Sequence, residues 1–184
     1  FDTNGNKLWD KNFTGTPTGY DFAYDISVDG SGNSYVAGYG SNLAPGSSSY
    51  DYWIMKLDSN GNKLWDVNFS TIYNDYAYGI SVDSSGNSYV SGRGYNLVSG
   101  SVSYDYWIMK LDSNGNKLWN VSFSTPWDDS AYDISVDSSG NSYVAGHGNR
   151  LVSGSYLTGE DWWIMKLDTN GNLLWDRNFT SKAN

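Results

Sequence analysis

The sequence predicts an all-β protein made of tandem antiparallel hairpins, and three observations predict this class. The motif Asp-x-x-Gly-Asn occurs seven times in 184 residues. The apolar runs beside it are short and rich in β-branched and aromatic residues, as strands are. Two kinds of flanking sequence alternate along the chain, represented by residues 56–65 and 80–90. No segment requires a helix.

Each copy of the motif predicts a tight hairpin turn. An Asp side chain at the first position of a type I turn accepts hydrogen bonds from backbone amides. Gly at the fourth position supplies the left-handed conformation that closes a three-residue loop with a bulge. The seven copies begin at Asp2, Asp29, Asp58, Asp83, Asp112, Asp137 and Asp168.

Two hairpins together form a larger repeat of about four strands, since Ile26, Ile80 and Ile134 are spaced 54 residues apart. A repeat of this length is typical of a β-propeller blade, whose sheet must pack against neighbouring sheets. The first strand is slim and aliphatic, which suits the narrow centre, and the fourth carries bulky residues that suit the rim. The strands are expected, in order, at 80–82, 88–91, 52–57 and 63–69.

The expected architecture is therefore a β-propeller-like array of three four-stranded antiparallel blades plus one extra terminal strand. We expect a single domain over residues 1–184. Its repeats lie approximately at 14–69, 70–123 and 124–179, with the extra fourth strand in 1–13.

The blade count does not close a ring, because closed propellers have roughly four to eight blades. Two copies of one outer strand, Lys7–Phe13 and Leu173–Phe179, lie near opposite ends of the chain. One of them is free to pair with another chain, so we expect a homo-oligomer, either a ring or a filament. The alternative is a fragment of a larger secreted propeller protein, and the start at Phe1 instead of Met fits a fragment or a processed product.

The repeats resemble the bacterial and archaeal β-propeller repeat family called SBBP. Its pattern is similar to Ala-x-x-Ile-x-Val-Asp-x-x-Gly-Asn-x-Tyr-Val-x-Gly, followed by Lys-Leu-Asp-x-x-Gly-x-x-x-Trp. The first part matches 23–38, 77–92 and 131–146, and the second matches 56–65, 110–119 and 166–175. The resemblance implies a propeller fold, usually within secreted or surface proteins, and provides no catalytic residues to transfer.

Composition excludes several partners. The net charge is −9, and no Lys/Arg cluster exists to neutralise phosphates, so we expect no nucleic-acid partner. No apolar run is long enough for a membrane helix, so we expect no membrane insertion. Cysteine is absent, which excludes disulfides. The lysine-poor surface, rich in Asp, Asn, Ser and Tyr, favours an extracellular or cell-surface location.

The hairpin turns are expected on one face of the propeller and the longer connections on the other, where a ligand site is most plausible. We expect these connections at 14–25, 39–51, 70–79, 93–105, 124–133 and 147–161. Aromatic side chains there are candidate platforms for carbohydrate, beside acidic and basic groups. The candidate ligand-binding residues are Tyr39, Tyr73, Asp75, Arg93, Tyr95, Trp127, Asp129 and His147.

Metal binding and catalysis find little support in the sequence. Four turns read Asp-x-Asn-x-Asn, as an EF-hand begins, but the glycine is at the fourth position and the twelfth residue is Phe. We therefore predict turn formation instead of a metal site. A single histidine and no recurring acid pair predict no enzyme and no cofactor. Possible glycosylation sequons begin at Asn12, Asn68, Asn120 and Asn178.

These observations favour a non-enzymatic, extracellular structural or adhesive protein that self-assembles through its blade edges. A lectin-like, carbohydrate-binding module is the alternative. Solution mass separates the first from a monomer, and glycan screening tests the second.

Overall fold

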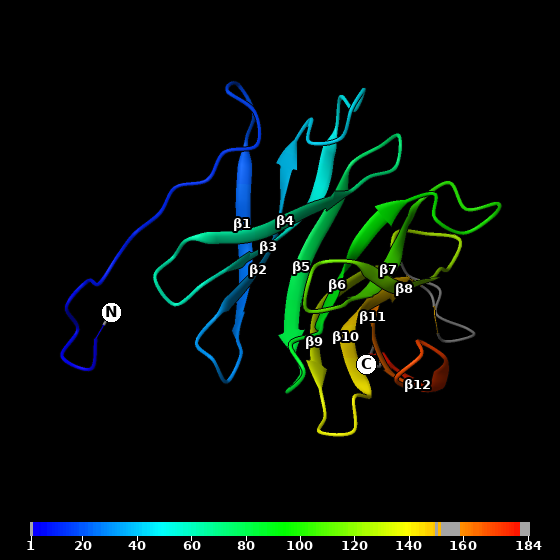
Figure 1. The fold of residues 1–184 in the computed structure, drawn as a ribbon. Helices are drawn as coiled ribbons and strands as arrows, with labels where there is room; N and C mark the ends of the chain where they lie inside the picture. The colour runs from blue at the N-terminus through cyan, green and yellow to red at the C-terminus, as the bar shows by residue number, and fades with distance from the viewer. Residues whose placement is uncertain (1, 150, 152–158, 181–184) are drawn as a thin grey trace.

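The computed structural model describes residues 2–149, 151 and 159–180, and within them the chain forms twelve strands in three separate four-stranded antiparallel sheets (Figure 1). The all-β prediction with three blades is confirmed. No helix in this part of the chain has the length and apolarity to cross a membrane. The first sheet contains β1 (Asp21–Val28), β2 (Ser34–Ser41), β3 (Tyr50–Leu57) and β4 (Lys63–Phe69); the second contains β5 (Asp75–Val82), β6 (Ser88–Tyr95), β7 (Tyr104–Leu111) and β8 (Lys117–Phe123); the third contains β9 (Ser130–Val136), β10 (Ser142–Asn149), β11 (Glu160–Leu167) and β12 (Leu173–Phe179).

The predicted role of the Asp-x-x-Gly-Asn motif is confirmed by the hydrogen bonds of its turns. In the turn between β3 and β4, Asp58 Oδ1 accepts the amides of Asn60 and Asn62 at 2.8 and 2.9 Å, and Oδ2 accepts Asn62 Nδ2 at 2.9 Å. Gly61 has φ +77°, the left-handed conformation that the bulge requires. These hydrogen bonds lower the pKa of Asp58, so the carboxylate stays ionised and keeps its acceptors.

The strands extend further toward the long connections than the sequence indicated. Tyr39, Arg93 and His147 were expected in loops, but they lie within β2, β6 and β10. The glycine before each of them does not end the strand but allows the neighbouring strand to pack closely. A Cβ on Gly38 would lie 1.9 Å from the Phe22 carbonyl oxygen. Part of the expected connection at 147–161 lies outside the described residues.

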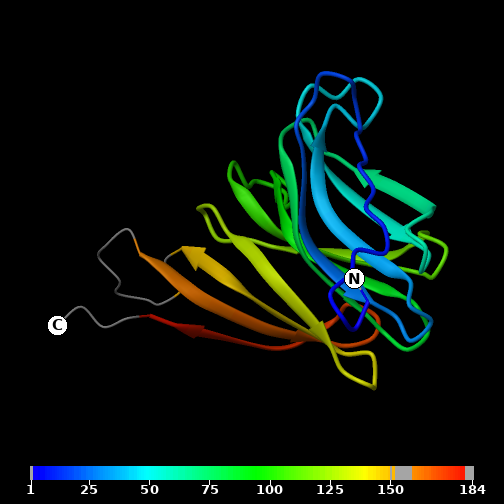
Figure 2. The ribbon, with the colours of Figure 1, turned by 90° about the vertical axis from the view of Figure 1, so that its left-hand side faces the viewer.

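Each sheet packs one face against the next sheet (Figure 2). We call the face toward the following sheet the back face and the face toward the preceding sheet the front face. The innermost strands β1, β5 and β9 lie beside one another, as predicted from their slim side chains. The first core joins Tyr35, Ala37, Tyr52 and Ile54 on the back face of the first sheet to Ala77, Ile80, Val90, Trp107, Met109 and Leu111 on the front face of the second.

The second core repeats the first one sheet later, and the polar contacts repeat with it. The buried hydroxyl of Tyr52 donates to the carbonyl oxygen of Trp107 at 3.0 Å, and Tyr106 donates to that of Trp163 at the same distance. At the rim, the indole of Trp65 donates to the Ser113 carbonyl oxygen at 3.0 Å. The same set of back-face and front-face groups therefore builds both interfaces.

The additional N-terminal element is an extended segment that pairs with none of the twelve strands. Its side chain Trp9 nevertheless docks on the first sheet as the rim tryptophans do on later sheets. The Trp9 indole donates to the Ser59 carbonyl oxygen at 3.1 Å, and its ring covers Gly61. Trp65 and Trp119 cover Gly115 and Gly171 in the same way. The segment thus occupies the rim position of a preceding blade without the rest of that blade.

Candidate functional site

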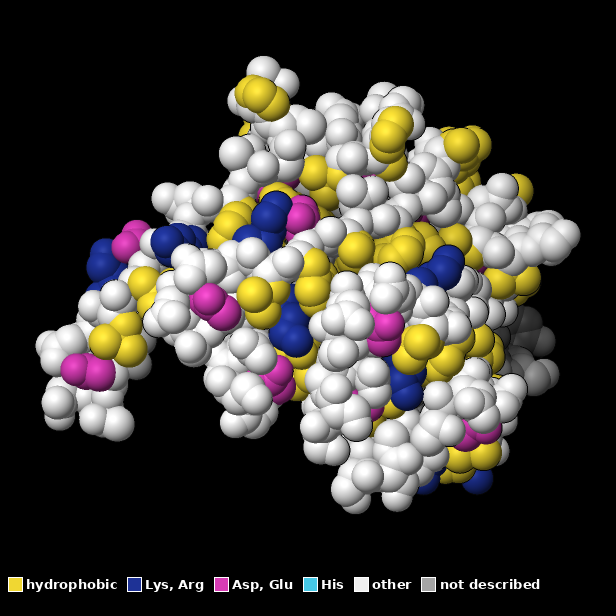
Figure 3. Space-filling model, in the orientation of Figure 1, with side chains coloured by type: hydrophobic (Ala, Val, Ile, Leu, Met, Phe, Trp, Pro, Cys, Tyr) yellow, Lys and Arg dark blue, Asp and Glu magenta, His cyan; other side chains and the backbone are white. Residues whose placement is uncertain are grey.

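The front face of the first sheet is the first candidate surface, because it is open where the equivalent faces are covered. Ile26 is 58% exposed, whereas its counterparts Ile80 and Ile134 are each 4% exposed. Ala23 is exposed, whereas Ala77 is fully buried. Apolar side chains reach the surface in several patches of the view in Figure 3. The first sheet therefore leaves exposed the positions that a preceding sheet covers in the second and third sheets.

The N-terminal segment covers this front face only in part. A hollow of about 280 Å³ remains between the segment and the sheet, and a second, of about 430 Å³, extends toward the innermost strand. Lys11 and Phe13 of the segment line both hollows, and Val36 and Leu57 line them from the sheet. A single strand-length segment does not fill the volume that a whole blade would occupy.

The back face of the third sheet is the complementary open surface. Tyr143 and Trp175 are partly exposed, whereas the equivalent Tyr35 is fully buried. The face also departs from its counterparts at two positions. Trp162, 69% exposed, stands where Tyr52 and Tyr106 are buried, and Arg177 stands where the other sheets have valine.

One backbone contact shows how an open face would be completed. Asp25 accepts the amide of Ile26 at 2.8 Å through Oδ1 and the amide of Ile80, in the next sheet, at 2.8 Å through Oδ2. Asp133 occupies the same position in the third sheet and accepts the amide of Ile134 at 2.8 Å. Its second carboxylate oxygen has no partner among the described residues, and a following sheet would supply one.

Two of the predicted ligand residues, Asp75 and Asp129, stabilise the connections that precede their strands. Asp75 and Asp129 are fully buried and accept hydrogen bonds from the backbone and hydroxyl of Thr71 and Thr125 respectively. Burial raises the pKa of Asp75 to about 7 and that of Asp129 to about 6, although the threonine hydrogen bonds oppose the rise. Their carboxylates therefore face inward and are not accessible to a ligand on this face.

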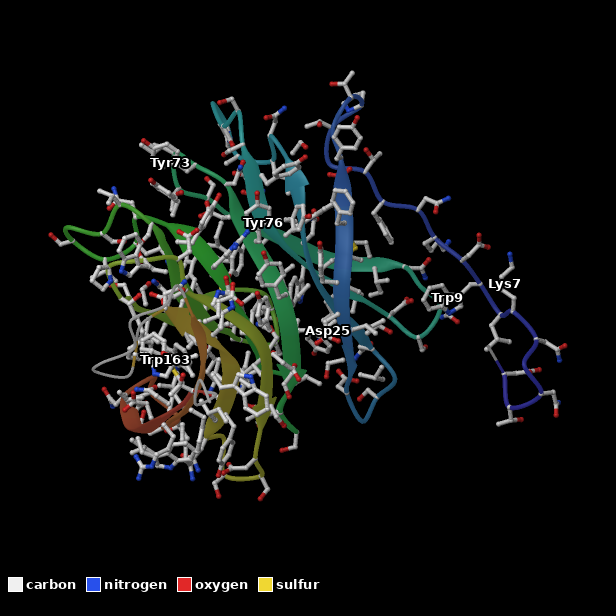
Figure 4. All side chains as sticks on the ribbon, turned by 180° about the vertical axis from the view of Figure 1, so that it is seen from behind. Lys7, Trp9, Asp25, Tyr73, Tyr76 and Trp163 are labelled. Carbon is white, nitrogen blue, oxygen red and sulfur yellow. The ribbon has the colours of Figure 1, made fainter. Side chains whose placement is uncertain are left out.

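The remaining predicted residues fall into two groups. Tyr73, labelled in Figure 4, precedes β5. Its ring contacts that of Tyr95 with centroids 4.5 Å apart, and Trp127 lies half-exposed after β8. Tyr39, Arg93 and His147 occupy equivalent positions on three successive sheets. Ligand binding by these residues stays a prediction.

Tyrosines that the sequence analysis did not select gather around Tyr39, Arg93 and His147. Tyr24, Tyr78 and Tyr132 come from the three innermost strands and contact one another in series, with ring centroids 5.4 and 5.7 Å apart. Each lies at the irregularity of its strand, which turns the side chain out of the regular ladder. Their 54-residue spacing was visible in the sequence. We call the cluster of Tyr24, Tyr78, Tyr132, Tyr39, Arg93, His147, Phe22, Tyr76, Tyr50 and Tyr104 the inner wall.

The chemical groups of the inner wall differ from the first sheet to the third. Tyr39 is enclosed by aromatic rings, with Tyr76 at 4.7 Å. Burial raises the pKa of Tyr76 and Tyr78 to about 12, so their hydroxyls remain protonated donors. Burial lowers the pKa of His147, while the neighbouring Glu160 opposes that change. The wall offers neutral hydroxyls, ring faces and one permanent cation, Arg93.

Other predicted features are placed as follows. The sequon residues Asn12, Asn68, Asn120 and Asn178 are all exposed. No group of three or more His, Cys, Asp or Glu residues arranged for a metal ion occurs in the described part of the chain.

Comparison with known proteins agrees with this fold. The family model of the SBBP β-propeller repeat matches residues 14–43 and 123–150, and the predicted SBBP-type repeats are confirmed there. No curated protein sequence matches the chain. The β-propeller domain of the Trilobed protease from Pyrococcus furiosus, described as having an open velcro topology, is similar in structure, with a TM-score of 0.50 and 11% identity. The alignment covers 86% of this chain and 43% of that one, so the likeness concerns the fold alone.

A second similar structure is the WD40 domain of Neurospora crassa Pan2, with a TM-score of 0.35 and 9% identity over 86% of this chain and 66% of that one. This similarity is too weak to bear on the fold. This chain spans less than half the length of the Trilobed protease domain described above. Its three sheets are open instead of closed into a ring.

Proposed function

We propose that this protein is a structural repeat module that self-associates head to tail. The back face of the third sheet in one copy packs on the front face of the first sheet in the next copy. The observation that carries the proposal is the exposure of Ile26, whose counterparts Ile80 and Ile134 are buried by the preceding sheet. Burying such a side chain stabilises a contact by about 1.5–3 kcal/mol relative to leaving it exposed.

The second copy is the favoured occupant because the complementary surface exists in the chain itself. The interface is already made twice, between the first and second sheets and between the second and third. The remaining front face and back face belong to the same two sets of positions. A heterologous contact of this kind produces a closed ring or an open filament, according to whether the rotation closes.

The proposed contact requires one of the two copies of the outer strand to move. In the next copy, the segment of residues 7–13 competes for space with β12 of the preceding copy. Either Trp175 replaces Trp9 on Gly61, or the segment replaces β12 beside β11. In both alternatives one tryptophan at the rim covers Gly61. In the first the segment of residues 7–13 is displaced, and in the second β12 is displaced.

The biological role we propose is non-enzymatic and structural or adhesive, in an extracellular or cell-surface setting. The lysine-poor surface, rich in Asp, Asn, Ser and Tyr, supports that setting. Arg177 makes the contact between copies more polar than the two contacts within the chain, and Trp162 lacks the hydroxyl with which Tyr52 and Tyr106 cross those internal contacts. The assembly is therefore weaker than the internal interfaces and responds to concentration.

Sedimentation velocity over a range of concentrations tests the proposal. The unmodified chain is expected to form dimers or longer species, and Ile26→Arg is expected to remain monomeric. Ile72→Arg, at an 83% exposed loop position, is the matched control and should assemble normally. A chain that stays monomeric at high concentration, or an Ile26→Arg variant that assembles like the unmodified chain, would contradict the proposal.

A further inference from the structure

We infer that the inner wall holds a binding site for a carboxylate-bearing sugar, centred on Arg93. This inference does not depend on self-association. It rests on an arginine that lacks an acidic partner, on the tyrosine rings around it, and on the way the equivalent positions of the other two sheets differ.

Arg93 is held in place by aromatic rings and leaves most of its hydrogen-bonding capacity unused. Its guanidinium carbon lies 4.3 Å from the ring centroid of Tyr104 and 4.9 Å from that of Tyr76. Its Nη1 donates to Ser130 Oγ at 3.4 Å, and its buried Nε has no hydrogen-bond partner. A guanidinium carries five N–H donors, arranged to receive a carboxylate with two parallel hydrogen bonds.

Arg93 makes no ion pair with any acidic side chain in the described part of the chain. Its guanidinium charge is therefore not neutralised by a neighbouring carboxylate of the described residues. One fixed positive charge matches one carboxylate, whereas the negative charge of the whole chain disfavours a ligand with several phosphates. The charge balance therefore favours a singly charged ligand.

The surrounding rings favour a sugar as the bearer of that carboxylate. Tyr24 and Tyr132 are each about half exposed, and Tyr78, partly buried, lies between them and within 5.9 Å of the Arg93 guanidinium. Aromatic faces pack against the apolar C–H face of a sugar ring, while tyrosine hydroxyls meet its polar edge. The row of three rings, one from each sheet, provides this platform beside the cation.

The equivalent positions on the other sheets do not reproduce the site. Tyr39 has no charge and is enclosed by Phe22, Tyr24 and Tyr76. His147 lies 3.7 Å from Glu160, whose carboxylate would repel a second one. The second sheet alone combines a cation with exposed neighbouring rings, so we expect one site in each copy.

Isothermal titration with a uronic-acid disaccharide and with its neutral counterpart, in which CH₂OH replaces the carboxylate, tests the inference. The acidic sugar should bind at least about tenfold more tightly than the neutral one, because charge-assisted hydrogen bonds to Arg93 are lost with the carboxylate. Arg93→Gln should weaken binding of the acidic sugar by about tenfold or more. Arg177→Gln removes a cation from the outer strand and should leave the affinity unchanged.

Three results would overturn the site. They are no binding of the acidic sugar at about 10 mM, where even a weak site fills; equal affinity for both sugars; or an Arg93→Gln variant that binds like the unmodified chain. If Arg93→Gln unfolds by circular dichroism, Tyr132→Ala carries the test, since it removes an exposed ring at little cost to the core. An unchanged affinity in folded Tyr132→Ala would then reject the platform.

Discussion

The two interior interfaces and the two open faces are built from equivalent positions and differ in their burial. Tyr35 and Tyr143 occupy the same position on the first and third sheets, yet Tyr35 is fully buried and Tyr143 is partly exposed. Ile26 and Ile134 show the same contrast on the opposite face. The side chains are alike, and the neighbouring sheet decides whether they are buried. The chain therefore forms the same kind of interface twice. The front face of the first sheet and the back face of the third carry the equivalent positions but are not covered by another sheet.

The largest expected effect comes from truncating the same residue inside and outside an interface. Ile134→Ala should lower the free energy of unfolding by roughly 2–5 kcal/mol, because it leaves a cavity in a packed core. Ile26→Ala should cost the monomer less than about 0.5 kcal/mol, because the side chain is already exposed. Urea unfolding at low protein concentration measures both. Equal losses would show that Ile26 is already packed in the isolated chain.

Glycine turns provide a second, smaller contrast. Gly115 has φ +86°, and a Cβ there would lie 3.0 Å from the Trp65 ring, whereas at Gly5, φ +82°, a Cβ would meet nothing within 4 Å. Gly115→Ala should cost about 1–2 kcal/mol from the left-handed conformation and more from contact with Trp65. Gly5→Ala should leave global unfolding unchanged, because its turn lies outside the sheets. A large effect at Gly5 would indicate that the N-terminal segment contributes to the stability of the sheets.

The tyrosine hydroxyls offer a third contrast at equivalent positions. Tyr35 donates across the interface to the Gly86 carbonyl oxygen at 3.2 Å, and Tyr143 has no following sheet to receive it. Tyr35→Phe should lower the free energy of unfolding by about 1 kcal/mol. Tyr143→Phe should lower it by a few tenths at most, since its exposed hydroxyl meets only groups of its own sheet, Asp137 at 3.3 Å and the Lys166 side chain. Thermal unfolding of the two variants side by side tests this difference.

The smallest expected effect is a gradual dependence of the free energy of unfolding on pH. Burial raises the pKa of Asp75 to about 7 and that of Asp129 to about 6, above the value near 3.9 in an unfolded chain. Their contribution to stability is therefore fully present below about pH 4 and is lost as the pH rises through about 6 to 7. Urea unfolding should show stability falling over this window, and Asp75→Asn with Asp129→Asn should flatten it.

Asp58→Asn is the control for this pH dependence. The pKa of Asp58 is lowered by its hydrogen bonds to Asn62, so this carboxylate titrates at a lower pH. The variant should keep the slope between about pH 4 and 8. A flat profile in the unmodified chain would show that the two buried carboxylates are ionised at no cost.

Much of the fold was predictable because its signals are local. The hydrogen bonds of Asp58 and the left-handed φ of Gly61 follow from residues within one turn, and the repeat spacing gave the three blades. The ends of the strands were not predictable, because Gly38 looks like a loop residue until the Phe22 carbonyl is known to lie against it.

The candidate surfaces were only partly predictable, for reasons of burial and bulges. In the sequence, Asp75 cannot be distinguished from an acidic residue on an exposed loop. Only the folded structure shows that its side chain is buried and accepts a hydrogen bond from Thr71. The row of Tyr24, Tyr78 and Tyr132 was visible as a spacing, but its exposure depends on irregularities that turn each ring out of its strand. The blade count and the duplicated outer strand predicted a neighbouring chain on the open faces, and that remains a prediction.

Disulfide trapping between copies tests the central claim most directly, because the chain contains no cysteine. Ile26→Cys and Asp133→Cys, placed on separate chains and mixed under mild oxidation, should form a mixed disulfide, since Asp133 would meet Ile26 of the next copy as Asp25 meets Ile80 within the chain. The double variant Asp25→Cys with Ile80→Cys is the positive control for this geometry. The account predicts the mixed dimer and little self-linking of either single variant. It is contradicted if the control links while the mixture does not, or if Ile26→Cys links to itself as readily as to Asp133→Cys.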